Sequence, residues 1–544
     1  MNKSLFIKSW MLLLLIISTC FSYAQKSSSP RIVNIVNFIR DIEPREAYIT
    51  KDVLYETVVN QVKLMKQYQL GGTFLLQYDA LIDERYISLL KTLPKGKFEI
   101  GAWWELPLPL IEKAGIKWRG KYAWDWHSDV GFSVGYTPAE REKIIDVYFT
   151  DFKKIFGYYP KSVASWVIDA HSLNYMYDKY KIVATANCKD QVGTDGFTLW
   201  GGYWNQAYYP SRINAYMPAQ HVDKQLPVPV FRMLGSDPIR QYADGRSVTT
   251  LEPVYKHAGG NEQWINWFFN SFVNDPSLGF NYTQAGQENS FTWNDMKKGL
   301  ELQMPIIAHL RDEGKVRVET MSASGEWFKK KYKVTPATTF TVTKDLGESD
   351  KKTIWYNSRF YRLNLLWEEG TMRIADIHLF NEIIPDKYFK GVTTVNQSFF
   401  YTLPVVDGFQ WGKTGHPTGL RLLTLDNGQP IPVKGGNPVF TNVDVNTAHI
   451  SWPSGKGTFE IDLKEKIMII KTTGTVPLNW YFELAVNDKA KVPLTGIKAN
   501  QIDYNFDGHI YQLVAEKGFF VKPENASLVQ LKPESGSIIL RIAD

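Results

Sequence analysis

The chain has 544 residues, of which 44% are hydrophobic, and a formal net charge of only +6. This length and apolar content can fill two or three domain cores, and the scattered Lys and Arg residues exclude a nucleic-acid footprint. Aromatic residues make up 14% of the chain, with 18 Trp. Exposed aromatic rings stack on sugar faces, so the composition favours a protein that handles carbohydrate.

The N-terminus has the order of a secretory signal peptide. Lys3 and Lys8 precede an apolar run, and a small-residue site ends at Ala24. The apolar run is shorter than the roughly 20 residues that a membrane-spanning helix needs. We therefore expect residues 1–24 to be removed and the mature protein to be periplasmic or extracellular, with no membrane span. Cys20 offers a lipid anchor as the alternative, although the residue before it fits a lipoprotein signal poorly.

Short β-rich runs alternate with amphipathic helical patterns from residue 31 to 338. Helices are predicted at 53–68 and 137–156, the second opening on a capping box at Thr137. The repeated order of strand, helix and strand predicts an α/β fold whose parallel sheet closes into a (β/α)7–8 barrel. The predicted strands are 32–38, 71–78, 98–104, 162–168, 181–187, 227–234, 279–285 and 315–321.

The character of the sequence changes after residue 338. Residues 339–352 read as a linker, and from 353 to 544 β-branched and aromatic residues alternate with polar ones between turn signals. Long helical patterns are missing from this part. We therefore expect an all-β C-terminal domain, an antiparallel β-sandwich.

Reactive groups of a (β/α) barrel lie at the C-terminal ends of its strands. Asp41 and Glu43 follow the first predicted strand, Asp169 ends the fourth, and Glu288 follows a late strand. Cleavage of a glycosidic bond needs two carboxyl groups, one protonated and one ionised. We favour Asp169 and Glu288 as this pair. Asp41 and Glu43 are further catalytic candidates, with a salt-bridged loop as the alternative interpretation.

Polar and aromatic residues near the other strand ends are the candidates for sugar binding. Alternation in FEIGAWWELP places Trp103 and Glu105 on one face, and the loop KYAWDWHSDVG at 121–131 is too polar for a core. One histidine between two acids is a weak metal signal, so we expect neither a metal ion nor a cofactor. The candidate substrate-binding residues are Trp103, Trp104, Glu105, Trp124, His127, His171, Lys189, Asp190, Trp204 and Arg212.

Three segments carry a family resemblance: GGTFLLQYDALID after the first helix, EIG at 99–101, and FGYYPKSVASWVID at 156–169. In these the chain resembles the glycoside hydrolase/deacetylase (β/α)-barrel superfamily, and more closely a family of exported Bacteroidota proteins that pair such a barrel with a C-terminal β domain. The segment WYNSRFYRLNLLWE at 355–368 is similar to the β domains that accompany family 38 and 57 glycoside hydrolases. The resemblance implies an enzyme that acts on carbohydrate.

The chain departs from the metal-dependent deacetylases of this superfamily. They place an Asp pair after the first strand and two histidines after EIG, where this sequence reads IRDIE and AWWELP. The resemblance therefore implies a glycosidase-like use of carboxylates, with Asp169 as nucleophile and Glu288 as acid. A rearranged metal site with His127 and His171 stays open.

Three functions follow from these patterns. The first is a metal-independent glycoside hydrolase acting on poly- or oligosaccharide, which predicts a close carboxylate pair flanked by Trp. The second is a metal-dependent polysaccharide deacetylase or carbohydrate esterase, which predicts an ion held by histidines. The third is a non-catalytic glycan-binding protein, which predicts an aromatic cleft whose acids all pair with Arg or Lys. The sequence leaves the oligomeric state open.

Overall fold

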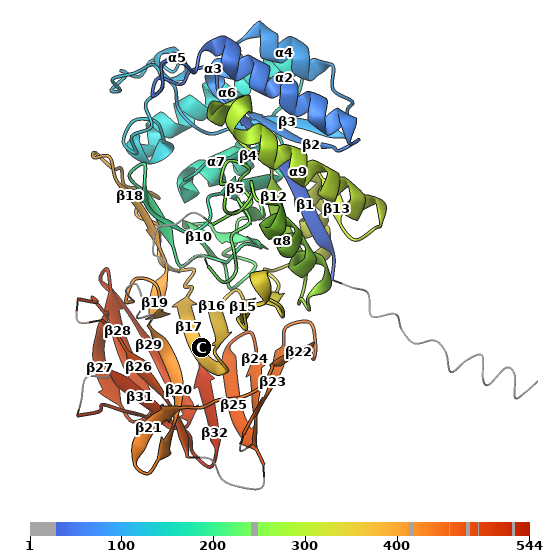
Figure 1. The fold of residues 1–544 in the computed structure, drawn as a ribbon. Coiled ribbons are helices and arrows are strands. Elements are labelled where there is room, and N and C mark those ends of the chain that lie inside the picture. The colour runs from blue at the N-terminus through green and yellow to red at the C-terminus, as the bar shows by residue number, and fades with distance from the viewer. Residues whose placement is uncertain are drawn as a thin grey trace, which may run out of the picture.

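The protein consists of an N-terminal α/β unit and a C-terminal all-β unit that lie end to end (Figure 1). The predicted signal peptide and Cys20 lie outside the described residues. No helix of the described part has both the length and the apolar character needed to cross a membrane. The computed structural model describes residues 29–240, 249–412, 418–455, 457–474, 479–487, 489–524 and 528–543.

The N-terminal unit is built on a nearly closed, barrel-like parallel sheet. Its strands follow the order β12-β1-β2-β3-β4-β5-β11, and β13 pairs in parallel with β1. Each of them falls within or closely overlaps one of the eight β-rich runs predicted from the sequence. The strands are β1 (Arg31–Ile39), β2 (Gly72–Leu76), β3 (Phe98–Trp103), β4 (Ser162–Ala164), β5 (Ala184–Asn187), β11 (Val230–Arg232), β12 (Asn281–Ala285) and β13 (Arg317–Glu319).

Helices cover the outside of this sheet (Figure 1). α6 starts where the sequence predicts it, because the Thr137 hydroxyl accepts from the Glu140 amide while the Glu140 carboxylate accepts from the Thr137 amide. The helices are α2 (Lys51–Gln67), α3 (Tyr78–Leu81), α4 (Glu84–Lys91), α5 (Leu108–Lys113), α6 (Pro138–Phe156), α7 (Ala170–Tyr180), α8 (Glu262–Asn274), α9 (Thr292–Asp312) and α10 (Met321–Lys331).

A side chain bridges the one gap in the barrel-like sheet. In the described residues no strand ladder joins β11 to β12. Gln206 lies between them: its backbone carbonyl accepts from the Arg232 amide at 3.1 Å, and its side-chain carbonyl accepts from the Tyr282 amide at 2.9 Å. The rings of Phe231 and Tyr282 pack across the same gap at 4.8 Å. The sheet therefore differs from a fully hydrogen-bonded barrel at this point.

Two antiparallel sheets face each other in the C-terminal unit and share one apolar core. The first contains β14 (Thr338–Val342), β15 (Lys352–Asn357), β16 (Tyr361–Glu368), β17 (Thr371–Leu379), β19 (Leu403–Asp407), β20 (Gly419–Asp426), β21 (Gln429–Pro432), β26 (Trp480–Ala485), β30 (Phe519–Val521) and β31 (Val529–Lys532). The second contains β22 (Val439–Asn442), β23 (Ala448–Ser454), β24 (Gly457–Leu463), β25 (Ile467–Thr473), β27 (Leu494–Lys498), β28 (Gln501–Phe506), β29 (His509–Lys517) and β32 (Ser537–Arg541).

The boundary between the units differs from the predicted linker at 339–352. β14 occupies residues 338–342 and pairs with β15, because its alternating Thr, Phe and Val side chains are all buried. A strand from the C-terminal half also pairs with the N-terminal unit. This strand, β18 (Ser398–Tyr401), runs parallel to β7 (Phe197–Trp200). β7 in turn pairs with β6 (Gln191–Thr194). The short strands β8 (Ala207–Tyr208), β9 (Pro210–Ser211) and β10 (Asn214–Pro218) complete this region.

An aromatic pair anchors the two units to each other. Trp204 stacks on Trp355 with ring centroids 4.5 Å apart and planes 4° from parallel. The backbone amide of Trp204 also donates to Asn357 at 2.8 Å. Trp204, a candidate for sugar binding, therefore packs in the junction between the units.

Replacing Gly201 by alanine tests how closely the units pack. At Gly201, with φ +86°, an added Cβ would lie 2.1 Å from Thr402 Oγ1 and 2.3 Å from His378 Nδ1. Gly193 is the matched control, since it has φ +69° and nothing within 4 Å of an added Cβ. We expect Gly201→Ala to lower the free energy of unfolding by roughly 1–3 kcal/mol more than Gly193→Ala, in urea denaturation. Equal losses would contradict the close packing.

A charged cleft at the mouth of the barrel

A cleft with about 630 Å³ of space opens at the carboxyl ends of the barrel strands. In parallel sheets of α/β proteins the carboxyl ends of the strands are where ligands bind. Its lining includes Arg40 after β1, Glu105 after β3, Trp166 after β4, Lys189 after β5, Leu234 after β11 and Glu288 after β12.

Arg40 forms the floor of the cleft. Its side chain is 2% exposed and contacts three carboxylates: Glu43 at 3.1 Å, Glu105 at 3.1 Å and Glu288 at 2.8 Å. The guanidinium also lies over the Trp124 ring, 4.3 Å from its centroid. Glu105 and Glu288 contact the same Arg40 nitrogen, Nη2. Their nearest oxygens are therefore within about 6 Å of each other, the range in which two carboxyl groups can flank one glycosidic bond.

Glu105 and Glu43 differ in protonation although both contact Arg40. The pKa of Glu105 is raised to about 7, mainly by burial. The positive charge of Arg40 acts against this rise, and the negative charge of Glu288 adds to it. Burial acts in the same direction on Glu43, but hydrogen bonds from Arg45 and the charges of Arg40 and Arg45 hold its pKa below the usual range. Glu105 is thus the cleft acid poised to donate a proton near neutral pH.

A second buried acid, Glu252, lines the same cleft. It accepts hydrogen bonds from Gln287 at 3.0 Å and from the Thr250 hydroxyl at 2.9 Å. Burial raises its pKa, and the charge of Lys189 acts against that rise. The Lys189 ammonium donates to the backbone carbonyl of Asp190 at 3.2 Å. Sequence reasoning missed Glu252, because no predicted strand ends beside it.

Tryptophans make one wall of the cleft. Trp124 and Trp126 stack with centroids 6.1 Å apart, and the Arg45 guanidinium lies 5.3 and 5.7 Å from their rings. Trp166, also in the lining, meets Trp103 edge to face at 5.3 Å. Flat aromatic faces beside a carboxylate pair are suited to holding a sugar ring next to reactive groups.

Of the four residues predicted to be catalytic, Glu288 lines the cleft and Glu43 supports Arg40. Asp169 does not line it: it is the N-cap of α7, and its fully buried carboxylate accepts from Ser133, Arg141 and Ser172 at 2.7–2.9 Å. These contacts are those of a structural cap. Asp41 is also absent from the lining and is paired with Lys51 and Arg85.

The predicted substrate-binding residues separate into two sets. Glu105, Trp124 and Lys189 line the cleft. Trp103 packs inside the sheet on Phe38 at 4.1 Å, and Trp104 packs against Tyr148 of α6 at 5.9 Å.

The remaining predicted residues are engaged elsewhere. His127 pairs with Asp125 and His171 with Glu142, so they form no joint metal site. Arg212 contacts Asn174. Asp190 faces the junction, where it pairs with Arg232 and Arg362.

Comparisons with known proteins agree with the fold of the N-terminal unit. No family model matches the chain. No curated protein matches it either. A glycoside hydrolase/deacetylase candidate from Parabacteroides distasonis superposes with a TM-score of 0.50 at 15% identity, over 72% of this chain and 89% of that one. Polysaccharide deacetylase candidates from Mycobacterium smegmatis and Pseudomonas aeruginosa, at 11% and 10% identity, each reach 0.35 over 56% of this chain and over 92% and 93% of their own.

The structural neighbours are therefore of glycoside hydrolase and polysaccharide deacetylase type. Only the first is similar enough to support an argument, and that argument concerns the fold alone.

Replacing Arg40 by glutamine tests its role as the shared counter-charge. We expect a loss of roughly 3–5 kcal/mol in the free energy of unfolding at pH 7.5, because the buried carboxylates lose their partner. The pKa of Glu105 would rise from about 7 still further above its ordinary value of 4.5, so the variant should be most stable in acid and lose stability as pH rises from about 4.5 to beyond 7.

Urea denaturation at pH 5.0 and 7.5 measures both effects. Arg212→Gln is the control, since its ion pair with Asp178 spans 3.7 Å between exposed side chains and should contribute little at either pH. An Arg40→Gln variant as stable as the Arg212→Gln variant at pH 7.5 would contradict the role of Arg40.

Proposed function

We propose that this chain is an exported, metal-independent glycoside hydrolase that acts on poly- or oligosaccharide in the cleft at the mouth of the barrel. The observation that carries the proposal is the meeting of Glu105 and Glu288 on one Arg40 nitrogen beside Trp124. Two carboxyl groups in different environments, next to an aromatic wall, are what glycosidic cleavage requires.

Glu105 serves as the general acid in this mechanism. Its pKa of about 7 keeps a proton available to the leaving-group oxygen near neutral pH. Glu288, whose counter-charge is Arg40 at 2.8 Å, serves as the nucleophile. The upper bound of about 6 Å on the distance between their nearest oxygens lies below the roughly 6.5–9.5 Å of inverting enzymes and admits the roughly 5–5.5 Å of retaining ones. We therefore propose a retaining reaction.

The same ion pairs favour a second candidate, a non-catalytic glycan-binding protein. Arg40 contacts Glu43, Glu105 and Glu288 at once, so three acids at the cleft have the cationic partner that this function predicts. A metal-dependent deacetylase is less favoured, because no histidine or cysteine is among the residues that line the cleft in the described part of the chain.

A screen on plant and host glycans separates these functions. Purified protein is assayed with and without chelator, and released reducing sugar and released acetate are read side by side. We expect sugar release that survives the chelator and falls by about 10²- to 10⁴-fold in Glu105→Gln and Glu288→Gln. Glu142→Gln, which changes a carboxylate outside the cleft lining, is the control and should stay fully active.

Each other outcome selects another function. Acetate release that the chelator abolishes would replace the proposal by a deacetylase. Glycan binding without release of either product would favour the binding protein.

The pH dependence tests the assignment of Glu105. An acid must be protonated to act, so kcat/KM should fall as pH rises through about 7, the pKa of Glu105. The residual activity of Glu105→Gln should lack this step, because an amide does not titrate. Initial rates between pH 5 and 9 measure it, and a wild-type profile that stays level from pH 6 to 8 would refute the assignment.

A further inference from the structure

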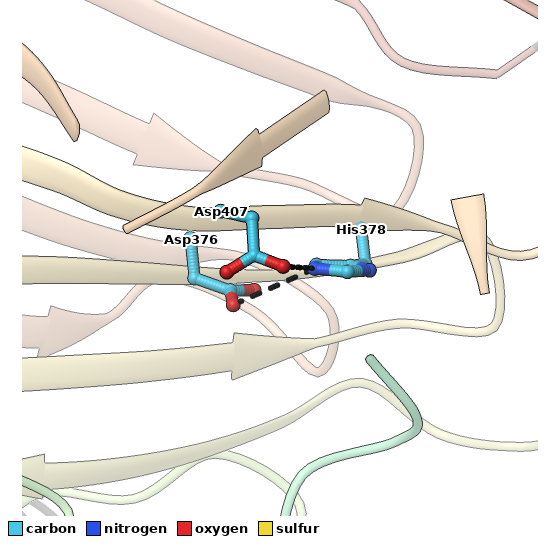
Figure 2. A group of neighbouring side chains, drawn as sticks. All are labelled: Asp376, His378 and Asp407. Atoms are coloured by element: carbon cyan, nitrogen blue, oxygen red, sulfur yellow. Dashed lines mark ion pairs between the residues drawn. The ribbon is translucent and has the colours of Figure 1, made fainter. Parts of the chain in front are cut away.

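Asp376, His378 and Asp407 meet at the junction between the two units (Figure 2). β17 carries Asp376 and His378, and β19 ends at Asp407. All three are at most 2% exposed. In the part of the chain that the structure describes, they are the one group of three potential metal ligands whose ligand atoms all lie within 4.8 Å of one another.

One nitrogen of His378 has its role fixed by its neighbours. Nδ1 lies 3.0 Å from the Thr402 hydroxyl oxygen, and that hydroxyl donates to the carbonyl of Gly201 at 2.7 Å. Because the Thr402 hydrogen is already used, His378 Nδ1 must carry a hydrogen and donate it. The other nitrogen, Nε2, is buried and has no hydrogen-bond partner in the described structure. It points at the two carboxylates (Figure 2).

The distances from this nitrogen are too long for hydrogen bonds. Nε2 lies 3.5 Å from Asp407 Oδ2 and 3.8 Å from Asp376 Oδ2. His449 shows a different arrangement, with one acid on each ring nitrogen: Nδ1 lies 2.7 Å from Asp462 and Nε2 lies 3.0 Å from Glu460.

A metal ion bound between these groups would account for the wider spacing. Ligand atoms bound at 2.0–2.2 Å to a tetrahedral Zn²⁺ are roughly 3.4 Å apart. The observed separations at His378 are near this value, and those at His449 are shorter.

Both carboxylates are oriented by hydrogen bonds that leave a lone pair open. Asp407 Oδ2 accepts from Trp200 Nε1 at 2.8 Å, and Asp376 accepts two bonds from Arg362 at 2.9 Å. Each Oδ2 therefore has one donor and keeps a second lone pair. Hydrogen bonds of this kind to ligand carboxylates, with a fixed histidine tautomer, are the usual surroundings of a metal ion in a protein.

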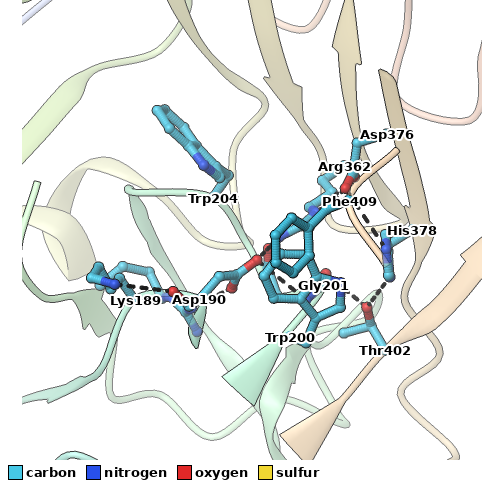
Figure 3. A network of polar contacts seen from close by, with 12 residues as sticks. Lys189, Asp190, Trp200, Gly201, Trp204, Arg362, Asp376, His378, Thr402 and Phe409 are labelled. Atoms are coloured by element: carbon cyan, nitrogen blue, oxygen red, sulfur yellow. Dashed lines mark hydrogen bonds and ion pairs between the residues drawn. The ribbon is translucent and has the colours of Figure 1, made fainter. Parts of the chain in front are cut away.

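The charges of the junction leave room for a cation. Arg362 pairs with two buried carboxylates, Asp190 and Asp376 (Figure 3), and Asp190 also pairs with Arg232. Asp407 adds a third buried carboxylate, 3.5 Å from His378. With His378 neutral, the carboxylates of this group outnumber its guanidiniums by one. A buried charge without a partner is costly, and a cation among Asp376, His378 and Asp407 would compensate it.

We propose that Asp376, His378 and Asp407 bind one divalent transition-metal ion of the Zn²⁺ type, with a fourth position left for water. The imidazole nitrogen and the two carboxylate oxygens are donors that Zn²⁺ accepts. The ion would tie the Trp200–Gly201 segment of the N-terminal unit to β17 and β19 through Trp200 and Thr402. Its role is structural and independent of the proposed hydrolase.

Metal content and thermal stability of the full chain, purified without a histidine tag, test this site. After exposure to Zn²⁺ and dialysis against metal-free buffer, we expect about one zinc per chain by elemental analysis. We also expect a Tm that rises with Zn²⁺ and falls with chelator, because the ion binds the folded state. Neither readout uses a glycan, so this test and the hydrolase proposal fail separately.

Variants locate the ion. Asp407→Asn should lose zinc. Thr402→Val removes the partner of Nδ1 and the hydrogen bond to the Gly201 carbonyl but no metal ligand, and it should weaken Zn²⁺ affinity by about 10- to 100-fold in competition with a chromogenic chelator. Thr402→Val keeps the test decisive if the ligand variants fail to fold. The matched control is His449→Gln, which should retain zinc.

Two results would overturn the site. One is a folded wild-type protein that retains no zinc and whose Tm changes with neither Zn²⁺ nor chelator. The other is zinc that His449→Gln removes as completely as Asp407→Asn.

Discussion

The mouth of the barrel depends on the ion pairs of Arg40. Glu43, Glu105 and Glu288 reach this buried guanidinium from segments that follow β1, β3 and β12. Without it, like charges would be buried side by side, which proteins tolerate only with a counter-charge. The same guanidinium packs over Trp124, so the charged floor and the aromatic wall of the cleft hold each other in place.

A second set of buried ion pairs joins the barrel to the sandwich. Asp190, just beyond β5, pairs with Arg232 of β11 and with Arg362 of β16, and Arg362 in turn pairs with Asp376 of β17. Its neighbour Lys189 lines the cleft instead. The consecutive residues Lys189 and Asp190 thus belong to the cleft and to the junction. Through the backbone, the position of Lys189 in the cleft is linked to the ion pair of Asp190 with Arg362 in the C-terminal unit.

Local patterns predicted the elements of the fold well and the composition of the cleft only in part. The β-rich runs and the capping box at Thr137 act within a few residues, so the strands and α6 appear where expected. Asp169 has the position of a reactive group, but its partners Ser133 and Arg141 come from distant segments. The position of Trp204 in the junction could not be predicted for the same reason, because its stacking partner, Trp355, lies far along the chain. The role of a carboxylate or an aromatic ring depends on the residues that contact it in the fold, and the spacing of residues along the sequence does not reveal those contacts.

The cleft and the junction differ in what a metal ion would meet there. In the cleft the carboxylates Glu105 and Glu288 converge on Arg40, and an ion at that point would have to displace a buried guanidinium. At the junction no cation would have to be displaced from between the two acids, Asp376 and Asp407, because the group that faces them there is a His378 nitrogen without a hydrogen bond. The two proposals therefore rest on opposite arrangements of charge: acids that share a cation in the cleft, and acids beside a histidine nitrogen without a hydrogen bond at the junction.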